Sequence, residues 1–478
     1  MRIAPEELSS VLSQFNPWWR GESISDLPAW RRAAWHELHR WVIHPPARRA
    51  VLLSGARQVG KTTLLLQSID ELLDSGVPPA NILYATFDHP ILKLSGIDAV
   101  LTAWRQREPR MDGPEYVFLD EAQFIRDWAT WIKHQVDFSR HRRIVFTGSA
   151  MPLLDANQES GVGRWHAIRL TTLSFFEYVQ LRRLQLPGLP RVGSLTELFD
   201  FSPSDLLRTQ ETAAAYSGHF HEYLVRGGFP QTAQVESITQ AQRLLREDIV
   251  DKVLKRDMTA LFGVRRVLDL EHTFLYLCMH DGGLLDMPAL CSNLNVKRPT
   301  AQHFIELLEA AHLLYRLLPF GYGKEVLRGK FKVYLADAAI APAVMLKGKA
   351  VLEDPIALGV ATETAVFKHL FARYYPRQIR FTYWRGKQNR GVDLIAEMGD
   401  LLIPFEVKYR SQHTGLRELR GLLEFCAQKH VERAYVVTKS LDDFGPIQEL
   451  PSETLTRILR VPAPLLCYWL GESESHTA

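Results

Sequence analysis

A glycine-rich segment early in the chain has the residue types and the spacing that bind a nucleotide phosphate. Its sequence is GARQVGKTT, which matches the pattern G-x-x-x-x-G-K-[ST]. The glycines let backbone N–H groups close around phosphate, the lysine reaches the β- and γ-oxygens, and the next hydroxyl binds Mg²⁺. We therefore predict a site for ATP and Mg²⁺ formed by Gly55, Ala56, Arg57, Gln58, Val59, Gly60, Lys61, Thr62 and Thr63.

An acidic pair, Asp120 and Glu121, follows the apolar run Tyr116–Leu119. Ligands of parallel α/β sheets bind at the carboxyl ends of the strands, where this pair is expected to lie. Asp120 is predicted to hold the Mg²⁺ shell together with Thr62, and Glu121 to polarise the attacking water. The other interpretation is an acidic pair that only stabilises the amino terminus of a helix.

Polar residues also follow a third predicted strand, Arg143–Thr147. They are Thr147 itself and the next residues, Gly148, Ser149 and Ala150. We predict that Thr147 contacts the attacking water or the γ-phosphate, as sensor residues of ATPases do. A plain polar turn is the alternative, because Thr, Ser and Gly are ordinary turn residues.

A parallel sheet would bring these three tips together, and the chain up to about residue 180 has the pattern of one. Apolar runs alternate with helical segments, which is typical of a parallel sheet covered by helices. The predicted strands are Ala50–Ser54, Asn81–Phe87, Tyr116–Leu119 and Arg143–Thr147, and a helix is predicted over Thr62–Leu73. Before them, a helix capped by Asp26 is predicted to turn Leu27, Trp30, Ala34, Leu38 and Trp41 toward a core.

A second group of chemistry-bearing residues lies near the carboxyl terminus. Val392–Ala396 and Leu401–Tyr409 are predicted to form a hairpin that carries two carboxylates and a lysine, and a helix over Ala361–Tyr374 adds a carboxylate. Carboxylates suit Mg²⁺, and metal-bound water is a good phosphodiester nucleophile. An ordinary hairpin with charged residues is the alternative. The residues of this predicted site are Glu363, Asp393, Glu406 and Lys408.

Residues 268–335 have the pattern of three helices followed by a hairpin, as in a winged helix. The third helix would carry basic and polar side chains near its amino end, where such a helix enters a DNA groove. Protein docking is the other use of this fold. These side chains are Lys297, Arg298, Thr300, Gln302 and His303.

Six segments carry a resemblance to the bacterial and archaeal AAA-type ATPases called archaeal-type ATPases, which have a C-terminal domain of unknown function. They are GARQVGKTT, VFLDEAQ (Val117–Gln123), FTGSA (Phe146–Ala150), GRWHAIRLTTLSFFEY (Gly163–Tyr178), YLVRGGFPQ (Tyr223–Gln231) and KVYLADAAI (Lys332–Ile340). The resemblance covers most of the chain after residue 45. It implies that Arg164 senses phosphate or acts as an arginine finger, with Arg226 as a weaker candidate; a surface arginine is the alternative.

The hairpin near the carboxyl terminus, with Asp393 on one strand and Glu406-Val407-Lys408 on the next, resembles the PD-(D/E)XK nuclease superfamily. In that superfamily the acidic residues bind Mg²⁺ and the lysine stabilises negative charge or positions water. The chain departs from the pattern before Asp393, where Gly391 and Val392 stand in place of the proline. The resemblance implies a nuclease-like fold and leaves cutting itself open.

Together these patterns predict an α/β protein with a P-loop AAA-type ATPase domain, a winged-helix middle domain and an α/β nuclease-like C-terminal domain. The predicted segments are 1–45 (a tryptophan-rich helical segment), 46–180 (the ATPase core), 181–265 (a helical lid and connector), 266–345 (the winged helix) and 346–478 (the nuclease-like domain).

Composition leaves two classes of function. The net charge is +3, yet residues 360–440 hold 14 Lys and Arg against 8 Asp and Glu, as a nucleic-acid partner would need. The first class is an ATPase that acts on DNA, branched or single-stranded. The second is a nucleotide-dependent switch or docking ATPase that cuts nothing. Phosphotransfer to a small molecule ranks below both. A homo-oligomer is a further possibility that the sequence leaves open.

The four cysteines form no close pair, and neither a signal peptide nor a membrane span is evident, so a cytoplasmic protein is expected.

Overall fold

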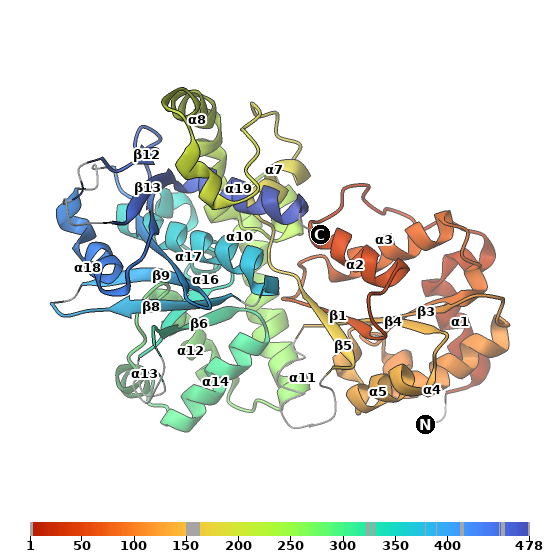
Figure 1. Cartoon of the computed structure of the whole chain (residues 1–478). Helices are drawn as coiled ribbons and strands as arrows, with labels where there is room; N and C mark the ends of the chain where they lie inside the picture. Colours follow the sequence, from red (N-terminus) through yellow and green to blue (C-terminus); the bar gives the residue numbers. More distant parts are fainter. Residues whose placement is uncertain are drawn as a thin grey trace. The chain divides into compact units, whose positions relative to one another are not determined.

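A computed structural model of the chain describes residues 3–149, 163–321, 326, 330–377, 379–388, 390–411, 415–448, 450 and 455–476. The chain forms two compact units (Figure 1). Unit 1 is the chain up to Leu170 together with Ala310–His312, and unit 2 is Thr171–Glu309 with the chain from Leu313 onward. Among the described residues, every helix is too short or too polar to cross a bilayer.

Unit 1 is built on a five-stranded sheet in the order β2-β3-β4-β1-β5, with every pair parallel. The four predicted strands all form, and their carboxyl ends lie at one edge of the sheet, as expected. The fifth strand, β5, follows residues that lie outside the described ranges and was not predicted. The strands are β1 (Ala50–Ser54), β2 (Ile82–Thr86), β3 (Glu115–Asp120), β4 (Arg142–Gly148) and β5 (Trp165–Arg169).

The helices of unit 1 are α1 (Pro5–Phe15), α2 (Ala34–Ile43), α3 (Lys61–Asp74), α4 (Pro90–Arg107) and α5 (Trp128–Phe138). Helix α2 begins at Ala34, so the predicted helix start at Asp26 is wrong. Pro28 disfavours the helical conformation of the residue before it, and Asp26 has a left-handed φ of 56°. Of the predicted core stripe, Leu38 and Trp41 are buried, whereas Leu27, Trp30 and Ala34 are half-buried.

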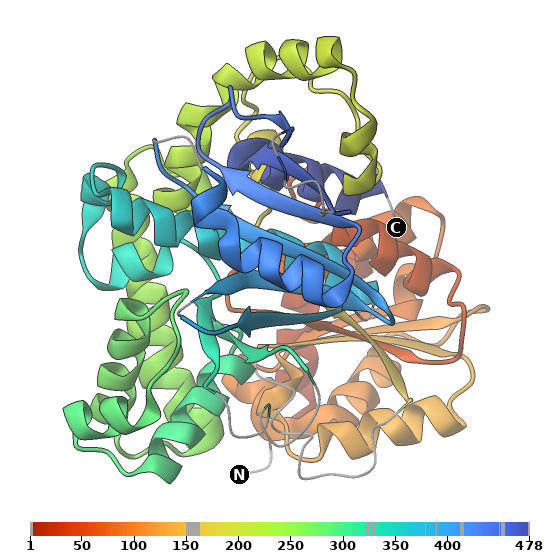
Figure 2. The same cartoon turned by 60° about the vertical axis from the view of Figure 1, so that its left-hand side comes forward.

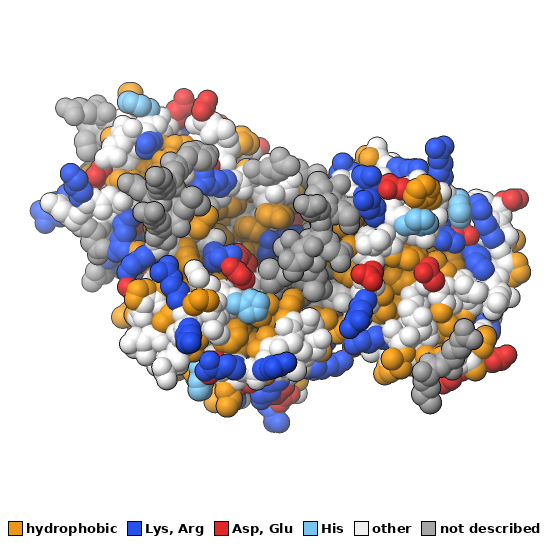
Figure 3. Space-filling model, turned by 90° about the horizontal axis from the view of Figure 1, so that it is seen from below, with side chains coloured by type: hydrophobic (Ala, Val, Ile, Leu, Met, Phe, Trp, Pro, Cys, Tyr) orange, Lys and Arg blue, Asp and Glu red, His pale blue; other side chains and the backbone are white. Residues whose placement is uncertain are grey.

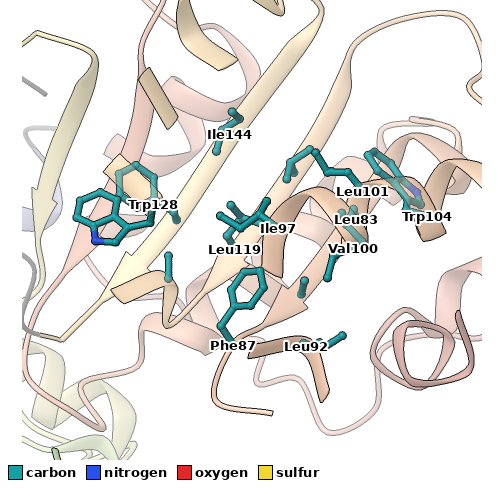
Figure 4. Close-up of a cluster of buried hydrophobic side chains, with 14 of the residues drawn as sticks. Leu83, Phe87, Leu92, Ile97, Val100, Leu101, Trp104, Leu119, Trp128 and Ile144 are labelled. Atoms are coloured by element: carbon teal, nitrogen blue, oxygen red, sulfur yellow. The ribbon is translucent and has the colours of Figure 1, made fainter. Parts of the chain in front are cut away.

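One core of unit 1 lies between the sheet and helices α4 and α5 (Figure 4). Leu83, Leu119 and Ile144 project from three neighbouring strands onto this face. Trp104 of α4 is fully buried against the cluster, and Trp128 of α5 is 5% exposed. Each such apolar side chain stabilises the fold by roughly 1.5–3 kcal/mol, which fixes the strands whose tips carry the polar residues.

Unit 2 is built on an eight-stranded mixed sheet in the order β12-β13-β11-β10-β9-β8-β6-β7 (Figure 2). Strands β9 and β10 form the predicted antiparallel hairpin, and β10 continues the sheet in parallel with β11. The strands are β6 (Leu314–Pro319), β7 (Lys332–Leu335), β8 (Arg380–Arg385), β9 (Gly391–Met398), β10 (Leu401–Lys408), β11 (Arg433–Thr438), β12 (Gly445–Pro446) and β13 (Arg457–Pro462).

Helices surround this sheet, and three of them precede the β6–β7 pair in the order predicted for a winged helix. However, β6 also pairs in parallel with β8, so this hairpin belongs to the larger sheet; a separate winged helix stays a prediction. The main helices are α7 (Phe175–Leu181), α8 (Pro203–Arg226), α10 (Ile238–Arg246), α12 (Val267–Met279), α13 (Met287–Leu294), α14 (Arg298–Ala310), α16 (Ile340–Val344), α17 (Pro355–Tyr374), α18 (Arg420–Lys429) and α19 (Ala463–His476). Shorter ones are α9 (Pro230–Gln234) and α11 (Met258–Phe262), and Glu247–Asp257 is π-helical.

Candidate functional sites

The glycine-rich segment forms a loop between β1 and α3, as the motif predicts. Lys61 is the first residue of α3 and is buried, and its Nζ donates hydrogen bonds of 2.9 Å to the carbonyl oxygens of Gly55 and Ala56. Gly60 has a left-handed φ of 99°. A Cβ atom at Gly55 would lie 2.2 Å from the carbonyl oxygen of Leu170, so only glycine fits this position.

A segment before α2 supports this loop. Arg32 is buried and donates from Nη1 to the carbonyl oxygen of Val59 at 2.9 Å. Gln67 of α3 donates from Nε2 to the carbonyl oxygens of Pro28 and Trp30 at 2.7 and 2.9 Å. No sequence motif marks this support, because Arg32 and Gln67 bind main-chain oxygens 27 to 39 residues away in the sequence.

The Asp120 carboxylate, at the end of β3, is surrounded by hydroxyl groups. Its Oδ2 accepts from Thr62 Oγ1 at 2.7 Å and from Tyr84 OH at 3.0 Å, and its Oδ1 accepts from Thr147 Oγ1 at 2.5 Å. Burial raises the pKa of Asp120, as does the nearby Glu121 charge, while the hydroxyl groups oppose the shift. The structure thus brings Thr62, Asp120 and Thr147 together, as predicted. Tyr84 was not predicted, since no motif marks it.

Glu121 follows directly, in a left-handed conformation with φ of 53°. Its backbone N–H donates to Thr147 Oγ1 at 2.9 Å, so Thr147 contacts both acidic residues. Gln123 donates from Nε2 to Glu121 Oε2 and, at 3.1 Å, to Ser149 Oγ. Gln123 stands in the quoted motif VFLDEAQ, but sequence reasoning gave it no role. Ala150 lies outside the described residues.

Of the two predicted phosphate-sensing arginines, Arg164 belongs to unit 1 and is not brought to this loop within that unit. Arg164 lies at the amino end of β5, whereas the loop follows the carboxyl end of the parallel strand β1. The Nε atom of Arg164 lies 2.8 Å from Asp137 Oδ1. At the carboxyl end of β5, Arg169 pairs in register with Ser54, immediately before the loop. Arg226, in unit 2, is buried and donates to the carbonyl oxygens of Val235 and, at 2.9 Å, Glu236.

In unit 2 the four predicted residues of the acidic cluster do lie together. Asp393 Oδ2 accepts from the backbone N–H of Val407 at 3.0 Å, and Glu406 Oε2 accepts from the N–H of Asp393 at 3.3 Å. Lys408 Nζ donates to Glu406 Oε1 at 2.5 Å. Glu363, from α17, joins them through a residue that was not predicted, Lys332.

Lys332 is the first residue of β7. Its Nζ lies 3.1 Å from Glu363 Oε1 and 3.0 Å from Asp393 Oδ1, and Tyr334 OH donates to the same Glu363 oxygen at 2.6 Å. Lys332 and Tyr334 were not predicted, although both lie in the segment KVYLADAAI, because Lys332 contacts residues 31 and 61 positions away in the sequence, and no local pattern marks such contacts.

Charge coupling dominates this cluster. Burial raises the pKa of Glu406 to about 8, with a further rise from the Asp393 charge, and burial also raises the pKa of Glu363. Burial opposes ionisation of Asp393, yet the charges of Lys332 and Lys408 bring its pKa below its ordinary value. The same carboxylates raise the pKa of Lys332 well above its ordinary value against the effect of burial. Asp393 and Lys332 are therefore a buried ion pair.

Comparison with known proteins finds similarity in the segment that carries the first site. Residues 47–179 match the family model of the AAA domain. The segment that carries the glycine-rich loop and the strands around it is therefore similar to an AAA domain, and it is called the AAA domain below. Residues 217–350 and 358–455 match two further families, each described only as a domain of unknown function.

Two relatives that cover most of this chain are each named only as an uncharacterized protein. An uncharacterized protein of Haemophilus influenzae is 26% identical over 371 residues, which cover 75% of this chain and 82% of that protein. An uncharacterized protein of Mycobacterium tuberculosis is 27% identical over 410 residues, which cover 82% and 77%.

Solved structures of low similarity include the ORC1 protein of Aeropyrum pernix in complex with DNA, with a TM-score of 0.29 and 14% identity over 69% of this chain and 97% of that one. AMPPCP-bound DnaA from Aquifex aeolicus has a TM-score of 0.23 and 14% identity over 57% and 86%. Similarity at these values carries no conclusion about this chain.

The AAA domain offers a fitting set of donors for ATP and Mg²⁺. The Thr62 hydroxyl and the Asp120 carboxylate are hard oxygen donors in direct contact at 2.7 Å, beside the lysine of the loop. The acidic cluster of unit 2 does not fit a divalent cation in the same way, since the Lys332 ammonium lies between Glu363 and Asp393. Among the described residues, no three His, Cys, Asp or Glu side chains form a group that could hold a metal ion.

Proposed function

We propose that the AAA domain binds ATP with Mg²⁺ and hydrolyses it. The observation that carries this proposal is the chain of hydrogen bonds from Thr62 through Asp120 to Thr147, next to the buried Lys61. Lys61 would exchange its two loop carbonyls for phosphate oxygens. Glu121 would accept the proton of the attacking water, and Thr147 holds the backbone of that residue in place. Bound Mg²⁺ would neutralise the developing phosphate charge.

Two substitutions test this proposal. Glu121→Gln keeps the shape of the side chain and removes the base, so ATP binding should persist while turnover falls by roughly a hundredfold or more. Lys61→Ala should lose ATP binding with the fold intact. Phosphate release and binding of a fluorescent ATP analogue measure the two effects. Wild-type turnover in E121Q would show that Glu121 is not the base.

We further propose that the ATPase acts on nucleic acid, with branched or single-stranded DNA as the expected class. Lys297, Arg298, Gln302 and His303 are exposed around the amino end of α14, where a groove-binding helix carries its contacts. On the face seen in Figure 3, Lys and Arg side chains are scattered among uncharged ones. This distribution favours a limited basic edge over a broad basic surface.

The test is ATP turnover with single-stranded, duplex and branched DNA at several salt concentrations. Stimulation that declines steeply with salt is expected, because phosphate contacts release counter-ions. Arg298→Glu should reduce the stimulation, whereas Arg243→Glu, an equal charge change on α10, should not. Turnover that is indifferent to every DNA would contradict this part of the proposal.

A second candidate function is a nucleotide-dependent switch that cuts nothing, and the position of Lys332 in the acidic cluster favours it. In this case ATP binding would set the conformation that recruits a partner. Slow, DNA-indifferent turnover, together with partner binding that differs between E121Q with ATP and wild type with ADP, would support the switch.

Arg164 is proposed to act on the ATP of a neighbouring copy in a homo-oligomer, since its side chain is 39% exposed and lies away from its own loop. Mixing Arg164→Ala chains with E121Q chains tests this role. Only E121Q chains keep the finger and only R164A chains keep the base, so mixed assemblies should recover turnover that neither variant shows alone. No recovery at any mixing ratio would remove Arg164 from the site.

A further inference from the structure

The acidic cluster of unit 2 contains a cation supplied by the chain itself. Lys332 Nζ donates to Glu363 Oε1 at 3.1 Å and to Asp393 Oδ1 at 3.0 Å. These two carboxylates come from different elements, α17 and β9, and both turn an oxygen toward one ammonium. The Lys332 side chain is only 12% exposed, so it is not a surface lysine that reaches the cluster by chance.

The remaining oxygens of the cluster are also engaged. Asp393 Oδ2 accepts from the N–H of Val407, and Glu406 accepts from the N–H of Asp393 and from Lys408 Nζ. At least five of the six carboxylate oxygens of Glu363, Asp393 and Glu406 therefore hold protein donors. A Mg²⁺ ion needs about six oxygen ligands at roughly 2.0–2.1 Å, so it would have to break several of these bonds.

The backbone fixes Lys332 in this position. Its strand, β7, pairs with β6, where Lys332 lies opposite Leu317, and an isolated bridge joins Lys332 to Leu284 on its other side. Moving the ammonium out of the cluster would leave two close, largely buried carboxylates without their shared cation, which is unfavourable. The arrangement is that of a structural ion pair with a defined place in the sheet.

We propose that Lys332 is a built-in counter-ion that takes the place of a divalent cation, so that the acidic cluster stabilises unit 2 and does not cut phosphodiesters with a metal. This inference concerns unit 2 alone and stands whether or not the AAA domain acts on DNA. The chemistry behind it is occupancy: the Lys332 ammonium lies between Asp393 and Glu363, binds an oxygen of each, and supplies one positive charge at the place that a metal would bridge.

Binding of Mn²⁺, followed by electron paramagnetic resonance without nucleotide, tests the proposal in the full chain. Because the AAA domain also has oxygen donors, only binding that Asp393→Asn removes is counted. Lys332→Met keeps the length of the side chain and removes the charge, and it should gain one Mn²⁺ site that K332M/D393N lacks. Wild type should show no such site.

Lys408→Met is the matched control, since it removes the other lysine of the cluster while Lys332 still holds Glu363 and Asp393. It should gain no site. If K332M does not fold, Lys332→Gln replaces it, because the amide still donates to the two carboxylates without a charge. The proposal is overturned by a Mn²⁺ site in wild type that D393N abolishes, or by a folded Lys332 variant that gains none.

Discussion

Hydroxyl groups hold the two acidic residues of the AAA domain in place. Thr147 donates to Asp120 and accepts from the backbone of Glu121, and the hydroxyls of Thr62 and Tyr84 bind the other Asp120 oxygen. Hydrogen bonds to a charged group contribute about 1.5–3 kcal/mol each. Burial raises the pKa of Asp120, and these hydrogen bonds oppose that rise. They therefore favour the ionised form that would bind Mg²⁺.

Replacing Thr147 with valine should therefore separate positioning from binding. The variant keeps the volume of the side chain and loses both hydrogen bonds, so we expect turnover to fall roughly tenfold to a hundredfold while ATP binding changes little. Ser68→Ala is the control, because Ser68 is an equally buried hydroxyl that donates to the Leu64 carbonyl within α3. Steady-state phosphate release gives both values. Unchanged turnover in T147V would leave Thr147 as an ordinary turn residue.

Asp281 is a buried carboxylate that should make unit 2 sensitive to pH. Burial raises its pKa to about 7, although it accepts from the N–H of Leu335 at 2.9 Å and from Thr364 Oγ1 at 2.8 Å. The folded chain thus binds a proton that the unfolded chain releases near pH 4, so the contribution of Asp281 to stability falls as pH rises from about 4 to about 7.

The Asp281→Asn variant lacks this ionisation. Its free energy of unfolding, relative to wild type, should rise by roughly 2 kcal/mol between pH 5 and pH 8, as measured by urea denaturation. Asp286→Asn is the control: the pKa of Asp286 is lowered by Lys330, so its effect should stay constant across this window. A D281N difference that does not change with pH would contradict the assignment.

At the scale of elements, the phosphate-binding loop depends on a segment that contains no part of the motif. Arg32 donates to Val59 in the loop, and Gln67 in the following helix donates to Pro28 and Trp30. The segment Pro28–Arg32 therefore contacts both the loop and α3, and it holds the loop from outside the nucleotide site.

Arg32→Ala should weaken ATP binding although Arg32 lies outside the motif. Loss of a buried charged donor leaves the Val59 carbonyl without that bond and loosens the loop, so the apparent ATP affinity should fall about tenfold, in line with a loss of roughly 1–3 kcal/mol. Arg31→Ala is the neighbouring control, since Arg31 pairs with Glu71 in a more exposed ion pair. Titration with a fluorescent ATP analogue measures both affinities. Equal affinity of R32A and R31A for the analogue would contradict the role of Arg32.

Local patterns sufficed for the elements that carry the motifs, but not for contacts between distant segments. The strands ending at Ser54, Asp120 and Gly148 each contain an uninterrupted apolar run and could be predicted from the sequence. Strand β5 was missed because Trp165–Arg169 mixes polar and apolar residues at the edge of the sheet. Lys332 was missed because its contact with Asp393 joins residues 61 positions apart in the sequence, which no local periodicity specifies.

At the scale of the molecule, the two units carry separate sheets and separate polar clusters. We expect differential scanning calorimetry to resolve two unfolding transitions, one for each unit. ATP with Mg²⁺ should raise the midpoint temperature of the transition that belongs to unit 1. At 100 times its dissociation constant, a ligand stabilises the state that binds it by about 2.7 kcal/mol. K61A, measured under the same conditions, should show no shift. A single transition that ATP with Mg²⁺ raises as a whole would mean that the units unfold as one body.

The strand order of the AAA domain also has a consequence for its synthesis. Strand β1, which leads into the phosphate-binding loop, lies between β4 and β5, and both of these are made much later in the chain. At about 5–20 residues per second, its neighbours follow on the order of ten seconds after it. Until Trp165–Arg169 has left the ribosome, the apolar β1 lacks a partner on one side, and a ribosome that stalls before this point would hold an incomplete nucleotide site.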